Sequence, residues 1–272
     1  MEIYRSFRYY KIDIRKYFDA VDNAVSDDDK EKSYLDLFNY YYNGFINMKD
    51  FSELKLITDN KELLNKLIVF VNDFITITKL RTEDLFNLLY NLAIEFFEKS
   101  YYYTALKLFK IVLTIKSLSL ENKCKCTLSL AELYDEIGDI KSADILLNSF
   151  IFINDHPDNN KLLSKIYSLL INIQLNYMYN YDKTELTDKV YFEKLDDYLS
   201  KIKIANSYDT DNLYTYYLYG QITCKMASHK INNKEINDLY DKAISKYNEA
   251  IKIILEINER DFDKNDELQL FS

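Results

Sequence analysis

Glycine and proline are almost absent from this chain, and their scarcity restricts its possible folds more than any other feature. The 272 residues include 3 glycines and 1 proline, whereas average usage is about 7% and about 5%. Hairpins and phosphate-binding loops need glycine where the backbone takes a positive φ, and all-β folds use both residues at their turns. The composition therefore predicts an all-α fold.

The remaining composition indicates a folded protein that is not a nucleic-acid binder. Hydrophobic residues make up 48% of the chain, enough for a packed interior. The formal charge of −9 disfavours nucleic acid as a partner, because contacts to phosphates need clustered lysine and arginine. Three cysteines, an odd and small number, favour a reducing compartment over a disulfide framework.

No signal for a membrane or for export is present. The best candidate span, residues 67–80, is interrupted by Asn72, Asp73 and Lys79 and is shorter than the roughly 20 residues that a bilayer requires. The N-terminus lacks the uncharged apolar core of a signal peptide. We therefore expect a soluble, intracellular, cytoplasmic protein. Residues 1–18 hold five basic and two acidic side chains, so a basic N-terminal helix at a membrane surface stays open as a minor alternative.

Two segments that begin 38 residues apart share one order of small, apolar and aromatic residues. The first is LAIEFFEKSYYYTALKLFKIVL (Leu92–Leu113), and the second is LAELYDEIGDIKSADILLNSFI (Leu130–Ile151). Each begins with leucine and alanine, has an aromatic residue three positions after the alanine, and then breaks. A second alanine follows, with apolar residues at intervals of four. This order predicts two antiparallel helices in each segment.

The alanines and the breaks have a mechanical explanation. Antiparallel helices that cross closely need small side chains where their axes approach. Four alanines are expected at these crossings: Ala93, Ala105, Ala131 and Ala143. The breaks are expected at Ser100 and Gly138, and glycine suits the left-handed conformation that often ends a helix.

This pattern resembles the tetratricopeptide repeat (TPR). A partial match covers residues 213–257, with Gly220 as the small contact, whereas residues 162–204 have helical spacing but no small residue at the crossing. The chain departs from the family in having no tryptophan, no repeat-ending proline, and a spacing of 38 residues where 34 is usual.

The resemblance implies a right-handed α-solenoid of antiparallel helix pairs, about five to six in number. We expect one helical-repeat domain over residues 1–260, with the best repeats at 85–117, 123–155 and 213–257. After residue 260 the apolar periodicity is lost, so residues 261–272 are expected to form a frayed polar C-terminal tail.

The sequence contains no recognisable catalytic or metal-binding motif, so we expect neither an enzyme, nor a cofactor, nor a metal site. Its two histidines, His156 and His229, both lie in polar segments. Cys124 and Cys126 are two residues apart on a predicted helix and so face different directions, unlike the ligands of a tetrahedral site. Three scattered glycines cannot build a phosphate-binding loop.

The remaining candidates for a functional site are residues on the protein surface. In the TPR family the first helix of each repeat lines a concave groove that binds a partner. The resemblance places nine residues at the outward positions of these helices: Tyr90, Ile94, Phe97, Leu128, Glu132, Asp135, Tyr214, Tyr217 and Gln221. It thus implies a groove with an aromatic and apolar end and an acidic middle. Tyrosine suits recognition, because it offers a ring and a hydroxyl at low entropic cost.

The leading hypothesis is a non-enzymatic adaptor or scaffold that binds a protein or peptide partner in this groove. One alternative is a structural subunit of a large assembly, similar to the helical-repeat subunits of the proteasome lid or of ciliary complexes. Another is a peptide-sensing TPR regulator. The sequence does not distinguish these three functions or identify the partner, and it leaves open whether the groove or the convex face binds it.

Overall fold

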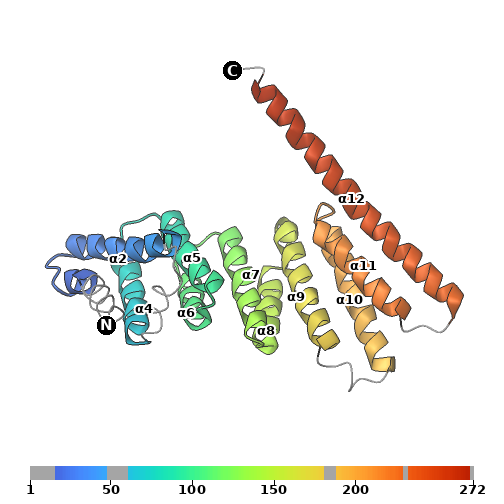
Figure 1. Cartoon of the computed structure of the whole chain (residues 1–272), viewed down its shortest axis with the longest axis horizontal. Helices are drawn as coiled ribbons and strands as arrows, with labels where there is room; N and C mark the ends of the chain where they lie inside the picture. Colours follow the sequence, from blue (N-terminus) through green and yellow to red (C-terminus); the bar gives the residue numbers. More distant parts are fainter. Residues whose placement is uncertain (1–15, 48–60, 181–187, 229–231, 270–272) are drawn as a thin grey trace, which may run out of the picture. The chain divides into compact units, whose positions relative to one another are not determined.

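The computed structural model describes residues 16–47, 61–180, 188–228 and 232–269 of the chain, and Figure 1 shows their helices. Within these ranges every regular element is a helix and no strand occurs, which confirms the all-α prediction. The chain divides into two compact units, Met1–Leu133 and Tyr134–Ser272. Most of the predicted basic N-terminal helix, residues 1–15, lies outside the described residues.

The first unit contains α2 (Asp27–Asn47), α4 (Lys61–Ile77), α5 (Thr82–Glu98), α6 (Tyr102–Val112) and most of α7 (Leu120–Glu136). Helix α2 packs on α4 and α5, and α5 packs on α6. The core between α2 and α4 is aromatic: the rings of Tyr34 and Phe38 meet those of Phe70 and Phe74 at centroid distances of 5.2–5.9 Å. Such pairs add stability beyond the apolar area that they bury.

The predicted small residues all lie in the interior. Ala93 and Ala105, which belong to the packed pair α5 and α6, are both fully buried. Ala131 in α7 and Ala143 in α8 are equally buried. A larger side chain at any of these positions would force neighbouring groups apart, because protein interiors are close-packed.

The first predicted break is a Schellman motif. Ser100 takes a φ of 63°, in the left-handed region. The N–H of Tyr101 donates to the carbonyl of Phe96 at 2.8 Å. The N–H of Ser100 donates to the carbonyl of Phe97, also at 2.8 Å. These two bonds satisfy carbonyls that the end of α5 would otherwise leave without partners.

The second break repeats this motif 38 residues later. Gly138 takes a φ of 78°. The N–H of Asp139 donates to the carbonyl of Tyr134 at 2.8 Å, and the N–H of Gly138 donates to that of Asp135 at 2.9 Å. The Asp139 side chain then caps the next helix by accepting from the N–H of Ser142 at 3.1 Å. The equivalence predicted from the two segments therefore extends to individual backbone hydrogen bonds.

The second unit contains α8 (Ile140–Asn154), a short 3-10 turn η1 (Pro157–Asn159), α9 (Asn160–Asn180), α10 (Asp188–Tyr208), α11 (Leu213–Ser228) and α12 (Asn233–Gln269). Each long helix packs on the next one along the chain, and α9 also contacts α11. The core between α9, α10 and α11 consists of large side chains: Ile171, Leu175, Met178, Tyr191, Leu195, Tyr198, Ile202, Leu218 and Ile222.

The C-terminal segment is more helical than its sequence suggested. The loss of apolar periodicity after residue 260 predicted a frayed tail, yet α12 continues to Gln269. An apolar stripe decides whether a helix packs against a neighbour, whereas the backbone bonds can continue from the preceding turns without one. No helix within the described ranges is long and apolar enough to cross a membrane.

Candidate interaction sites

Tyr90, one of the predicted groove residues, is a core residue in the structure. Its side chain is buried, and its hydroxyl shares a hydrogen bond of 2.8 Å with the Ser129 hydroxyl. Its ring stacks on Phe86 at 5.1 Å. Burial raises the pKa of the Tyr90 phenol. Because it joins α5 to α7 inside the first unit, Tyr90 is not available to a partner.

The other predicted positions on α5 and α7 are more accessible. Ile94 and Phe97 on α5 and Leu128 on α7 are half-buried. Glu132 is exposed, yet the protein atoms around its carboxylate displace enough water to raise its pKa. The pKa of Asp135 is raised by desolvation and then by the neighbouring Glu136. Leu128, Glu132 and Asp135 thus give α7 one apolar position followed by two acidic ones, and their contact with a partner stays a prediction.

The three predicted positions on α11 come together as one exposed cluster. The rings of Tyr214 and Tyr217 stack at a centroid distance of 5.8 Å with an interplanar angle of 16°. Their side chains are 38% and 44% exposed. The Gln221 carboxamide donates to the Tyr217 hydroxyl at 2.6 Å, which restrains the Tyr217 ring.

Helix α12 extends this cluster. Gly220 lets the two helices approach so closely that the Tyr247 ring lies where the Cβ atom of any other residue would be. The Tyr247 ring also lies 6.2 Å from that of Tyr217, so it borders the same cluster. Burial raises the pKa of Tyr247 to about 12, with smaller contributions from Cys224 and Tyr217.

On both sides of Tyr247 in the sequence, α12 carries a row of exposed apolar residues. Tyr240, Ile244, Ile251 and Leu255 are 40–56% exposed, at spacings of four, seven and four residues. A helix of 3.6 residues per turn brings such positions to one side. Tyr247 lies on the same side, because it follows Tyr240 by seven residues and precedes Ile251 by four. We define the α11–α12 face as Tyr214, Tyr217, Gln221, Tyr240, Ile244, Tyr247, Ile251 and Leu255.

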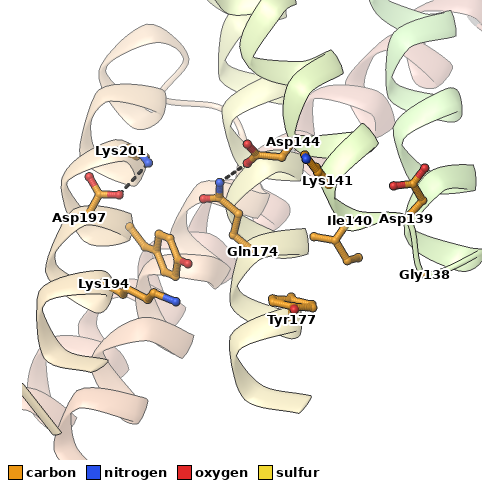
Figure 2. Close-up of a pocket in the computed structure, with 11 residues that line it drawn as sticks. Gly138, Asp139, Ile140, Lys141, Asp144, Gln174, Tyr177, Lys194, Asp197 and Lys201 are labelled. Carbon is orange, nitrogen blue, oxygen red and sulfur yellow. Dashed lines mark hydrogen bonds and ion pairs between the residues drawn. The ribbon is translucent and has the colours of Figure 1, made fainter. Parts of the chain in front are cut away.

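A cavity of about 600 Å³ lies elsewhere in the second unit, between the first turn of α8, α9 and α10. Figure 2 shows Gln174 and Tyr177 on α9 between α8 on one side and Lys194 on α10 on the other. Three lysines and three aspartates line the cavity: Lys141, Lys194, Lys201, Asp139, Asp144 and Asp197. No sequence motif predicted it, because its lining comes from positions scattered over three helices. Among the described residues, no group of histidine, cysteine and carboxylate side chains could hold a metal ion.

Comparison with known proteins gives similarity only at the level of structure. No family model matches the chain, and no curated protein matches it. Among solved structures, MamA from Desulfovibrio magneticus RS-1 is 14% identical, with 80% of this chain and 96% of that chain covered and a TM-score of 0.42.

Two other similar structures are TPR proteins by their descriptions. YrrB, described as a TPR protein with an unusual peptide-binding site, is 14% identical over 81% of this chain and 97% of its own, with a TM-score of 0.40. The TPR2AB domain of yeast Sti1, in a complex with pHSP90, is 11% identical over 95% and 96%, with a TM-score of 0.33. TPR is the class that the repeated sequence pattern resembles.

Proposed function

We propose that this chain is a non-enzymatic protein-interaction adaptor that binds an amphipathic helix of a partner on the α11–α12 face. The observation that supports it is the gathering of exposed aromatic and aliphatic side chains on one side of two packed helices. Contiguous apolar patches are uncommon on soluble monomers and mark interaction surfaces. Tyrosine is enriched at such surfaces, and often dominates their energetics.

The arrangement suits a helix better than an extended segment. The exposed residues of α12 recur at four and seven positions, which is the spacing that an amphipathic helix presents along its own apolar side. Two such rows can interdigitate along their length. Each fully buried isoleucine would contribute about 1.5–3 kcal/mol, so Ile244 and Ile251 supply a large part of the affinity in this arrangement.

A second candidate function is that of a structural subunit, with the same face packed permanently in a larger assembly. The length of the row on α12, from Tyr240 to Leu255, favours this version, since obligate interfaces are larger and more apolar than transient ones. A chain that remains monomeric in dilute solution and exchanges its partner freely would support the adaptor over the subunit.

The test is a pull-down from the native cell with quantitative mass spectrometry. The variant Ile244→Asp/Ile251→Asp places two charges on the face and is expected to lower partner recovery at least tenfold. Ile145 on α8 is 56% exposed and lies outside the face, so Ile145→Asp is the matched control and should recover the partner normally. Far-UV circular dichroism checks that all variants stay helical. Equal recovery by the face variant and the control would refute the proposal.

A further inference from the structure

The carboxamide of Gln174 has one satisfied end and one unsatisfied end. Its amino group donates to Oδ1 of Asp144 on α8. Its oxygen, Oε1, is buried and has no hydrogen-bond partner among the described residues. Gln174 lines the cavity between α8, α9 and α10 (Figure 2). A buried acceptor without a donor is destabilising, so this atom is a place where a ligand would add stability.

The orientation of this carboxamide is fixed. Turning the carboxamide over would place Oε1 against the Asp144 carboxylate and leave the amino group without its acceptor. Two acceptor oxygens facing each other repel, so the opposite orientation is disfavoured. Gln174 therefore offers an acceptor to the cavity, and a bound group must supply an N–H or O–H donor to complete it.

The charges around the cavity favour a neutral ligand. Lysines and aspartates are equal in number in its lining, and Asp197 pairs with Lys201 at 2.7 Å. Asp139 caps α8, and Asp144 accepts from Gln174. Neither a cation nor an anion is attracted by a surplus of the opposite sign. An amide, which is neutral and carries a donor next to an acceptor, matches such a lining.

We propose that this cavity binds an extended peptide through one of its main-chain amides. The N–H of that amide donates to Oε1 of Gln174, and a neighbouring carbonyl accepts from the ammonium of Lys194, which has three N–H donors. The ring of Tyr177, 40% exposed, contacts the side chains of the peptide, and the buried ring of Tyr198 forms part of the cavity wall. The volume of about 600 Å³ is typical of sites that enclose small ligands or a few residues of a chain.

This site is separate from the α11–α12 face, so the two proposals fail independently. The probe is a library of random 12-residue peptides displayed on phage and selected on the full-length chain. The peptides that survive are then synthesised and measured by fluorescence polarisation. We expect Gln174→Met and Tyr177→Ala to weaken them at least tenfold. Gln221→Met changes a glutamine of the α11–α12 face and should leave them unaffected.

A scan of the synthetic peptides identifies the group that Gln174 binds. Methylating each main-chain nitrogen in turn should abolish binding at one position, whereas replacing asparagine or glutamine side chains with alanine should not. The opposite result assigns the site to a side-chain carboxamide and overturns the main-chain proposal. Failure to select any peptide that distinguishes the native chain from Gln174→Met also overturns it. Thermal unfolding of both variants confirms that they are folded, and Tyr177→Ala changes only an accessible side chain.

Discussion

Gly220→Ala is the sharpest test of the packing between α11 and α12. A Cβ atom added at Gly220 would lie 2.5 Å from two ring atoms of Tyr247 and 3.0 Å from a third. Contacts under about 3 Å do not occur between unstrained carbon atoms. The new methyl group must therefore displace the Tyr247 ring, which closes the α11–α12 crossing and borders the exposed face.

Two opposing effects decide whether Gly220→Ala raises or lowers the free energy of unfolding. Replacing glycine with alanine inside a helix stabilises it by about 1 kcal/mol, whereas overpacking an interior contact costs about 1–3 kcal/mol. With the ring in place we expect Gly220→Ala to lower the free energy of unfolding by about 1 kcal/mol. In a Tyr247→Ala background the clash is absent and only the helix propensity remains. The same substitution should then raise the free energy of unfolding by about 1 kcal/mol.

The measurement is urea unfolding of four proteins: the native chain, Gly220→Ala, Tyr247→Ala and the double variant. The coupling between the two sites is expected to be about 2 kcal/mol, within the range found for residues in contact. The slope of the transition should stay constant, so that the midpoint reports stability. If Gly220→Ala stabilises both backgrounds equally, the Tyr247 ring does not occupy the place that the structure gives it, and the reasoning is refuted.

Two further predictions concern the repeat breaks and the acidic position on α7. Gly138→Ala should lower the free energy of unfolding by about 1 kcal/mol through backbone strain alone, because an added Cβ meets nothing within 4 Å. Ser100→Gly relieves the same kind of strain at a φ of 63° and should raise the free energy of unfolding. Urea unfolding in which Gly138→Ala stabilises and Ser100→Gly destabilises would contradict both. Glu132 has a pKa raised by desolvation, so the folded state holds its proton to higher pH than the unfolded state does, and stability falls as pH rises from the ordinary glutamate range through the raised pKa. Glu132→Gln removes this dependence. We expect the variant to gain up to about 0.5 kcal/mol in the free energy of unfolding at pH 7, the usual limit for an exposed position, and to gain nothing in acid. A stability gain that grows as the pH falls would contradict the prediction.

The parts of the fold that depend on local chemistry were predictable from the sequence. The scarcity of glycine and proline predicted helices throughout. Ser100 and Gly138 were identified as breaks, and both have a left-handed φ. Gly220 was expected at a close crossing and meets the Tyr247 ring. Each of these positions is determined by steric limits that act over one or two turns of a helix, which a sequence pattern can express.

The sites were less predictable, because they depend on how several helices meet. Tyr90 follows the helical spacing of an outward residue, but α5 also meets α7, and the Tyr90 phenol bonds to Ser129 on that helix. Apolar periodicity does not distinguish a side that packs on a partner helix from a side that packs on the next repeat. The cavity lined by Gln174 has the same origin, since its lining is drawn from α8, α9 and α10 and has no spacing of its own.

The row on α12 also bears on whether the many isoleucines of this chain reflect function or only composition. A general excess of isoleucine and tyrosine would scatter exposed residues over all sides of a helix. On α12 they fall on one side, next to the fully buried Ala243, while the opposite side is polar: Asp238, Lys242, Ser245, Lys252 and Glu256. The apolar part of α12 is thus wider than the strip that α11 covers. The additional width is what the proposed partner helix would cover.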